Sequence, residues 1–456
     1  MGHVVRRNKG MDGQLTTPGA HREGRVGTWP RRRRVLRAVT VLLLAMTWAA
    51  ACGGRDENTR LTLSGSALGP EAEVVRRQLA RFAESQPGVS VELRVTPDAA
   101  DQRHQLYVQW LNARVPDPDV LQLDVIWTAE FAGAGWILPL DEFADDSDDF
   151  VPAAVAASRW RGRQYAVPWF VDLGLLYWRT DLLDAAPRTL QGLRAEADRL
   201  RSAGATRFGL VWQGARYEGL VTVFLEHLGA FGGGILDTQG RVIVDQPAAI
   251  QALTFMCDAV SGDGFVPPSV LAWQEEQTRF AFQNGEAAFM RNWPYAWALL
   301  QDDAQSRVAG RFAVAAFPAD ASGRPTAALG GAQLAVNARS AYPDLASALV
   351  RFLTAPEQML ERARLAAQLP ARRSLYDSEA LAEALAIPVG QVRHILDSAV
   401  SRPVTPVYSE LSEILQVRLH RALSGQQTPA VALHEAARDM RALLARTGLA
   451  AEPLTP

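Results

Sequence analysis

The order of strand-like and helix-like segments in residues 61–127 restricts the fold more than any other feature of the sequence. Short apolar runs there alternate with longer segments in which apolar residues recur at helical spacing. In chain order these segments occupy residues 61–65, 71–86, 89–95, 98–113 and 120–127. Strands that alternate with helices form parallel sheets with right-handed connections. The pattern predicts an α/β fold whose ligands bind beyond the carboxyl ends of the strands.

The rest of the folded chain continues with strands and helices of ordinary length. Further helices are predicted at 191–203, 219–230, 247–261, 273–284, 343–354, 356–368, 409–424 and 428–446, and further strands at 208–212, 311–318 and 329–336. With 456 residues, the chain is long enough for two domains with complete cores.

Residues 165–182 combine one carboxylate with several aromatic side chains. Residues 168–170 predict a stiff aromatic turn, residues 174–178 predict a buried strand, and residues 179–181 can cap a helix. Asp172 lies between the turn and the strand. A carboxylate accepts hydrogen bonds from hydroxyl groups, and flat rings cover the apolar C–H face of a sugar. The segment therefore suits a polyhydroxylated ligand, although a core strand with one surface aspartate is the alternative.

A second aromatic cluster lies at residues 290–297, where a proline stands between two aromatic side chains. The composition fits either a packed corner of the core or a platform on which a ligand stacks. Residues 329–336 predict a strand that begins near two glycines, which allow close approach of the backbone to a neighbour.

The amino-terminal segment has the pattern of an export signal. Residues 1–51 contain 10 Lys and Arg but only 2 Asp and Glu, and a short apolar run leads to small residues and Cys52. This pattern resembles a bacterial lipoprotein signal, with Ala49 where leucine is usual, and it implies lipidation of Cys52. Residues 1–51 are then the signal peptide and residues 52–60 a flexible tether. A plain signal peptide with an incidental cysteine is the alternative, and Sec and twin-arginine export both remain open.

Composition excludes several classes of function for the rest of the chain. The residues after 51 carry 37 basic and 47 acidic side chains, which argues against nucleic-acid binding. They contain no lysine, so Schiff-base chemistry and a Walker A phosphate loop are excluded. Cysteine and histidine show no metal-ligand spacing, and Cys257 fits a small buried hydrophobic residue. We therefore predict no metal and no cofactor.

Six segments of the chain resemble, in the same order, the extracellular solute-binding proteins of ABC importers, and in particular the branch that binds maltose and trehalose. These segments are PDV with LDVIW (118–127), YAVPWFVDLGLLYWRTDLL (165–183), VWQGARYEGLV (211–221), RNWPYAW (291–297), LGGAQL (329–334) and SRPVTPVYSELSEI (401–414). The resemblance implies a periplasmic-binding-protein-like α/β fold with two discontinuous lobes joined by a hinge. The implied lobes are residues 61–168 plus 316–370 and residues 169–315 plus 371–456, with crossings near 165–173, 313–318 and 368–373.

The resemblance also implies a ligand site, residue by residue. Phe170 stands where the family has a tyrosine, and Ala332 stands where its disaccharide binders carry a tryptophan. The implied ligand-binding residues are Glu71, Arg103, Asp124, Phe170, Asp172, Trp293, Tyr295, Gly331 and Arg402. Because two aromatic or hydroxyl groups of the family are missing, the resemblance leaves open which sugar binds.

The function that the resemblance implies is capture of an α-glucoside such as trehalose or maltose by hinge closure, without catalysis. The implied partners are a carbohydrate, membrane permease subunits with their ATPase, and the membrane itself through a lipid anchor at Cys52. The protein would be a monomer on the outer face of the cytoplasmic membrane. A secreted glycoside hydrolase with paired carboxylates is one alternative, and a binding protein for another polyol or oligosaccharide is the other.

Overall fold

The computed structural model describes residues 59–450, except 68–69, 263, 321–322, 386 and 397. These residues belong to one compact unit of the chain, which covers residues 58–456. The predicted signal peptide and Cys52 lie outside the described residues. The first strand begins at Thr59, so the predicted tether ends two residues earlier than expected.

A parallel β-α-β-α-β arrangement opens the fold, as the alternating sequence pattern predicts. Its elements are β1 (Thr59–Gly65), α2 (Glu71–Glu84), β2 (Val89–Val95), α3 (Ala100–Asn112) and β3 (Val120–Asp124). Strand β1 pairs in parallel with both β2 and β3. Strand β3 ends at Asp124 rather than at residue 127, because the chain turns there into the short helix α4 (Thr128–Gly133).

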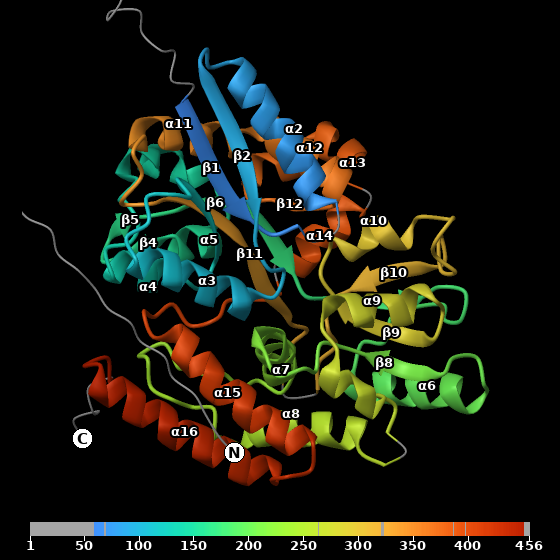
Figure 1. Cartoon of the computed structure of the whole chain (residues 1–456). Helices are drawn as coiled ribbons and strands as arrows, with labels where there is room; N and C mark the ends of the chain where they lie inside the picture. Colours follow the sequence, from blue (N-terminus) through green and yellow to red (C-terminus); the bar gives the residue numbers. More distant parts are fainter. Residues whose placement is uncertain are drawn as a thin grey trace, which may run out of the picture. The chain divides into compact units, whose positions relative to one another are not determined.

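Later parts of the chain complete this first sheet. Strands β6 (Val167–Leu173), β11 (Ala327–Val336) and β12 (Leu369–Pro370) extend it in the order β12-β6-β11-β3-β1-β2, and β13 (Ala399–Val400) pairs with β11 (Figure 1). Strand β11 is antiparallel to both β3 and β6. The sheet is therefore mixed, and it brings together strands that are more than 100 residues apart in the sequence.

The second sheet has the order β10-β7-β9-β8. Its strands are β7 (Leu175–Arg179), β8 (Phe208–Val211), β9 (Ala287–Asn292) and β10 (Phe312–Ala315). Strand β6 of the first sheet ends at residue 173 and β7 of the second sheet begins at residue 175, so a single residue, Gly174, separates them. The division into two lobes, with its boundaries and crossings, stays a prediction.

Helices surround the two sheets (Figure 1). Helices α6 (Leu190–Ser202) and α9 (Glu275–Gln283) pack on the second sheet, whereas α7 (Glu218–Ala230) contacts β11 and β13 of the first sheet. Helix α8 (Pro247–Val260) packs on α7, and the final helices α15 (Tyr408–Leu423) and α16 (Pro429–Arg446) pack against α7 and α8. The remaining elements are η1 (Asp141–Asp149), α5 (Pro152–Ala157), β4 (Arg159–Trp160), β5 (Arg163–Gln164), η2 (Pro268–Ala272), α10 (Ala296–Leu300), α11 (Pro343–Leu353), α12 (Pro356–Ala366), η3 (Arg373–Asp377), α13 (Glu379–Ala384) and α14 (Val389–Leu396).

Two local predictions for residues 165–182 are wrong. Residues 168–170 form part of strand β6 instead of a turn, because Trp169 and Phe170 are both buried within the core. Residues 179–181 cap no helix: Arg179 instead forms an ion pair with Asp181, and the next helix begins at Leu190. Thr189 caps that helix through its side chain.

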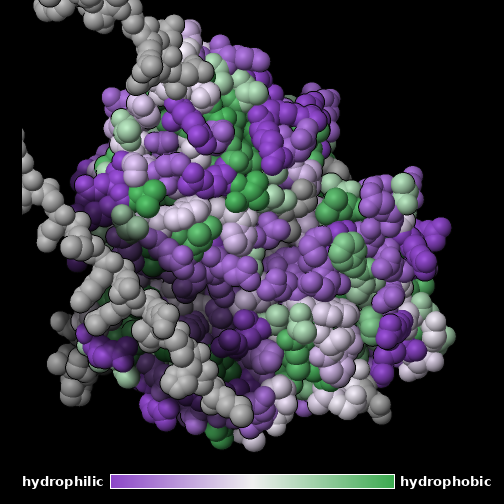
Figure 2. Space-filling model, in the orientation of Figure 1, coloured by the Kyte–Doolittle hydropathy of each residue, from purple (hydrophilic) through white to green (hydrophobic). Residues whose placement is uncertain are grey.

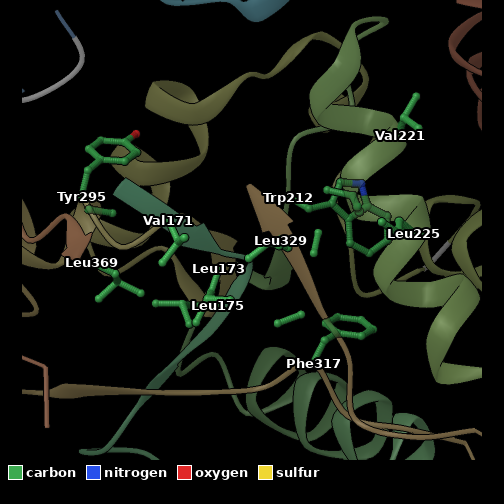
Figure 3. Close-up of a cluster of buried hydrophobic side chains, with 14 of the residues drawn as sticks. Val171, Leu173, Leu175, Trp212, Val221, Leu225, Tyr295, Phe317, Leu329 and Leu369 are labelled. Atoms are coloured by element: carbon green, nitrogen blue, oxygen red, sulfur yellow. The ribbon is translucent and has the colours of Figure 1, made fainter. Parts of the chain in front are cut away.

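A continuous hydrophobic core joins the two sheets where the chain crosses between them. Figure 3 shows part of this core, in which side chains of β6, β7, α7 and β11 pack together. On the outside, the face in Figure 2 carries small hydrophobic areas separated by hydrophilic side chains. None of the helices in the described part of the chain is both long enough and apolar enough to cross a membrane.

Candidate ligand-binding site

A cavity of about 120 Å³ lies beyond the end of β3, where the parallel strands predict a ligand site. Its walls come from β3, β6 and β11 of the first sheet and from helices α2, α3, α7 and α9. All nine predicted ligand-binding residues line this one cavity: Glu71, Arg103, Asp124, Phe170, Asp172, Trp293, Tyr295, Gly331 and Arg402. Their roles in binding stay predictions, but the structure brings every one of them together.

The register of the first sheet explains why residues distant in sequence meet here. Asp124, the last residue of β3, lies opposite Ala332 of β11, and Asp172 of β6 lies opposite Gly330. Between these positions Gly331 has a φ of 118°, and a Cβ atom there would lie 2.3 Å from the carbonyl oxygen of β6. Only glycine fits such a backbone, so the bent strand itself forms part of the cavity wall.

Asp172 is a cavity-lining carboxylate whose oxygens are not bound by other groups in the described part of the protein. No hydrogen bond or ion pair holds it among the residues that the structure describes. Burial, together with the nearby carboxylates Glu71 and Asp124, raises its pKa from 3.8 to about 7, against the opposing influence of Arg362 and Arg291. An acceptor without partners beside a cavity is available to the hydroxyl groups of a ligand.

Glu71 also faces the cavity, but the protein already binds its carboxylate. Ser66 Oγ donates to it at 2.5 Å, Gln122 Nε2 donates at 3.3 Å, and Arg362 Nη2 lies 3.5 Å away. Burial lowers the pKa of Arg362 to about 10, against the opposing influence of Glu71. Glu71 therefore holds the start of α2 in place and has less acceptor capacity left for a ligand than Asp172.

The two predicted arginines differ in what they hold. Arg103 donates from Nη1 to the carbonyl oxygens of Pro97 and Asp98, and its guanidinium lies 5.3 Å from the ring centre of Trp127. Its Nε has no partner among the described residues. Arg103 therefore braces the loop between β2 and α3 through Nη1, while its Nε–H donor remains unused.

Arg402 joins two walls of the cavity. Its Nη2 donates to Asp124 Oδ1 at 3.0 Å, and its Nη1 donates to Glu218 Oε1 at 2.8 Å. Burial by itself would lower the pKa of Arg402, but these two carboxylates raise it above the usual value. Tyr408 also donates to Glu218, at 2.8 Å. Arg402 thus connects the end of β3 to the start of α7.

The aromatic cluster supplies both a cavity wall and part of the core. Trp293 is half-buried and its Nε1 donates to Glu275 at 3.4 Å, while the Tyr295 hydroxyl donates to Glu276 at 2.7 Å. Trp297 does not line the cavity. It packs edge-on against Phe312 in the core, with the two ring centres 4.7 Å apart. The interpretation as a packed corner is confirmed for Trp297, whereas stacking of a ligand on Trp293 and Tyr295 stays a prediction.

Sequence reasoning missed several cavity residues. They are Ser66, Asp98, Gln122, Tyr217, Glu218, Thr222, Glu275 and Gln368. Tyr217 and Glu218 lie in one of the six segments that carry the family resemblance, so that segment could have indicated them. Glu275 has no comparable signal, because it reads as an ordinary first-turn helix acid. In the described ranges no three His, Cys, Asp or Glu side chains are grouped as metal ligands.

Comparisons with known proteins agree with this arrangement. The profile of the bacterial extracellular solute-binding proteins matches residues 69–360. A "Probable ABC transporter-binding protein" of Deinococcus radiodurans is 34% identical over 406 residues, which cover 86% of this chain and 95% of that protein.

Solved structures show the same likeness. The maltose-bound MalE3 of T. maritima is 41% identical and has a TM-score of 0.81, with 85% of this chain and 100% of that chain covered. The GacH receptor of Streptomyces glaucescens, solved unliganded and with acarbose, is 27% identical and has a TM-score of 0.75, with 85% and 98% covered. These likenesses confirm the predicted periplasmic-binding-protein-like fold. The chain belongs to the family of bacterial extracellular solute-binding proteins.

Proposed function

We propose that the protein is the sugar-binding component of an ABC importer and that it captures an α-glucoside such as trehalose or maltose. The observation that carries this proposal is the cavity in which Asp172, without a partner in the described residues, lies beside Trp293. The carboxylate would accept hydroxyl hydrogen bonds while the indole covers a sugar face. The family match and the maltose-bound relative at 41% identity support a sugar as ligand.

The identity of the sugar depends on two positions in the cavity wall. Ala332 lines the cavity with a methyl group, and Phe170 presents a ring that has no hydroxyl. A smaller wall and one fewer hydrogen-bonding group favour a ligand that is larger than a disaccharide or differently linked. The relative with acarbose bound supports the inclusion of longer α-glucosides among the candidates.

The proposed cycle has three parts. Two lobes close on the sugar about the crossing strands, the loaded protein docks on a membrane permease, and a separate ATPase subunit drives import. Export and lipidation at Cys52 would keep the protein, as a monomer, at the outer face of the cytoplasmic membrane. The likeness to a probable ABC transporter-binding protein supports the place in an importer.

Isothermal titration with trehalose, maltose, maltotriose and longer α-glucosides tests the proposal. We expect saturable binding of at least one of these sugars, with an affinity that falls at least tenfold in Asp172→Asn, because charge-assisted hydrogen bonds contribute about 1.5–3 kcal/mol. Absence of heat with every α-glucoside would contradict the choice of ligand. Similar affinity in the variant would contradict the role of Asp172.

A secreted glycoside hydrolase is the second candidate function. The observation that favours it is a carboxyl group whose pKa is raised to about 7 near two other carboxylates, as in the acid of a hydrolase. Incubation of the purified protein with the same sugars separates the two candidates. Released glucose would identify a hydrolase, whereas unchanged sugar after binding fits the solute-binding family.

A further inference from the structure

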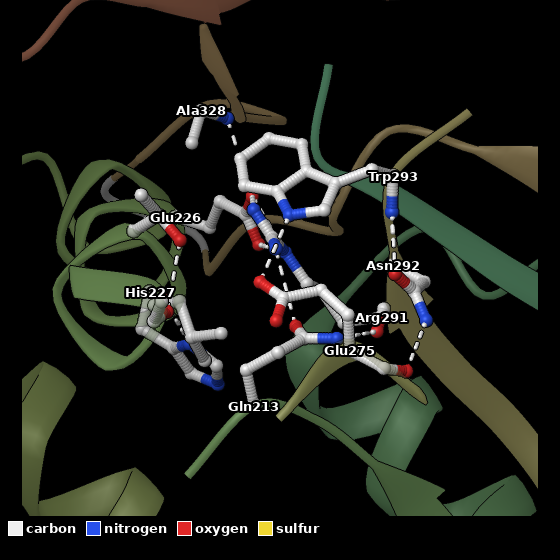
Figure 4. Close-up of polar contacts among 11 residues, drawn as sticks. Gln213, Glu226, His227, Glu275, Arg291, Asn292, Trp293 and Ala328 are labelled. Carbon is white, nitrogen blue, oxygen red and sulfur yellow. Dashed lines mark hydrogen bonds and ion pairs between the residues drawn. The ribbon is translucent and has the colours of Figure 1, made fainter. Parts of the chain in front are cut away.

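A buried ion pair lies directly beneath Trp293 and has no place in the ligand contacts described above. Glu226 of α7 and Arg291 of β9 are 0% and 1% exposed. Arg291 Nε donates to both carboxylate oxygens, at 3.0 and 2.9 Å, and Nη2 donates to Oε1 at 2.6 Å (Figure 4). Arg291 Nη1 donates to Gln213 at 3.1 Å, so each guanidinium nitrogen makes at least one hydrogen bond.

The upper side of this pair is occupied by the ring of Trp293. The guanidinium carbon of Arg291 lies 3.9 Å from the ring centre, within the range of a cation–π contact (Figure 4). The Tyr177 hydroxyl donates to the backbone oxygen of Trp293 at 2.8 Å, and Glu275 accepts from the indole N–H. The backbone and the indole nitrogen are thus held by other residues, and Arg291 lies against the face of the ring.

The other side of the pair touches the backbone at the crossing between the two sheets. The Ala328 N–H of β11 donates to Glu226 Oε1 at 3.3 Å, and the Gly174 N–H donates to the Ala328 oxygen at 3.0 Å. A Cβ atom on Gly174 would lie 1.6 Å from Glu226 Oε1 and 2.6 Å from Arg291 Nη2. The ion pair therefore fills the space of the missing side chain at the single residue that joins β6 to β7.

We propose that Glu226 and Arg291 form a positioning pair, which sets the plane of Trp293 for the ligand and ties that ring to the crossing backbone at Gly174. Among the cavity-lining residues, Trp293 stacks directly on Arg291. Arg291 influences Asp172 through its charge, and Arg291→Lys keeps that charge, so the variant changes mainly the contact with the ring. The ligand-related part of the proposal rests on the proposed sugar-binding function. A buried ion pair adds little net stability compared with apolar side chains of the same size, whereas the planar, bidentate guanidinium orients its neighbours in a way that lysine cannot.

A double-mutant cycle between Arg291 and Trp293 tests the ligand-related part with maltose or the α-glucoside that the wild type binds most tightly. Arg291→Lys should weaken binding about tenfold, the scale of a desolvated cation–π contact. In the Trp293→Leu background the same change should weaken binding less than twofold, because the ring through which it acts is gone. Equal losses in both backgrounds would overturn the proposal.

A spectroscopic test without ligand separates this proposal from the sugar-binding one. The near-ultraviolet circular dichroism of the wild type minus that of Trp293→Leu isolates the signal of this ring. We expect Arg291→Lys to shift or remove the same difference signal. An unchanged signal would refute the positioning role even if no sugar binds.

A matched control is available on the same sheet. Arg179 of β7 also forms a bidentate pair, with Asp181 at 2.6 and 2.5 Å, and neither residue lines the cavity. Arg179→Lys should leave both the affinity and the Trp293 signal unchanged. If Arg291→Lys gives no folded protein, Glu226→Gln provides the same two measurements, because it keeps an acceptor for the Ala328 N–H and removes the charge.

Discussion

Replacement of Asp172 by asparagine should stabilise the ligand-free protein while it weakens ligand binding. Asparagine has the same shape as aspartate but cannot carry its charge. In the folded protein the Asp172 carboxyl is disfavoured as an anion, first by burial and then by Glu71 and Asp124, so its pKa rises from 3.8 to about 7. The variant removes this unfavourable charge.

The size and the pH dependence of the effect follow from the pKa shift. A rise of about three units corresponds to about 4 kcal/mol, at 1.36 kcal/mol per unit. Between about pH 4 and pH 7 the folded state keeps a proton that the unfolded state has lost. The free energy of unfolding of the wild type therefore falls as the pH rises through this window, and the full cost is present above about pH 7.

Urea denaturation of the ligand-free protein at pH 5, 6, 7 and 8 measures this cost. At pH 8 Asp172→Asn should be more stable than the wild type by up to about 4 kcal/mol, and its advantage should shrink steadily towards pH 5. Asp258→Asn, a change at an exposed aspartate of α8, serves as the control and should alter stability little at any pH.

Two results would refute this reasoning. The first is a variant that is less stable than the wild type at pH 8, which would mean that the Asp172 anion is stabilised in the folded protein. The second is a difference that does not change with pH, which would mean that the effect comes from packing and not from charge.

Three further predictions concern the backbone, the bridge between cavity walls and the anchor. Gly331→Ala should lower the free energy of unfolding by about 2–3 kcal/mol, because its φ is positive and the added Cβ would clash with a backbone carbonyl oxygen. The control Gly135→Ala should cost less, because Gly135 also has a positive φ but no atom lies near the added Cβ. Arg402→Met should cost about 3–5 kcal/mol in urea denaturation, since two carboxylates lose their cation, whereas the exposed Arg441→Met should cost at most about 1 kcal/mol. Cys52→Ser should move the protein from the membrane fraction to the medium, and continued membrane association would contradict lipidation.

Local sequence patterns predicted the regular elements well. The helix predicted at 219–230 is α7 (Glu218–Ala230), and the strand predicted at 89–95 is β2 with the same bounds. Hydrophobic periodicity is a local property, so it predicts helices and strands without knowledge of the fold. The predicted turn at 168–170 failed because a proline and two aromatic residues can also enter a strand when both faces are buried.

The candidate site was predicted as a set of residues but not as a set of contacts. All nine predicted residues line one cavity. The sequence did not show that Arg402 joins Asp124 to Glu218, since these partners are 278 and 184 residues away. Nor did the sequence show that Arg291 forms its ion pair with Glu226 of α7.

The sequence by itself determined the α/β class and the parallel start of the first sheet, and its resemblance to a known family supplied the residues of the candidate site. Those conclusions depend on local periodicity and on motifs that stand in one stretch of chain. Only the tertiary structure decided which charges are paired: Glu71 is hydrogen-bonded by the protein, whereas Asp172 is not. The physical reason is that burial and distance to other charges set the cost of a carboxylate, and both arise from segments that meet only in the folded protein.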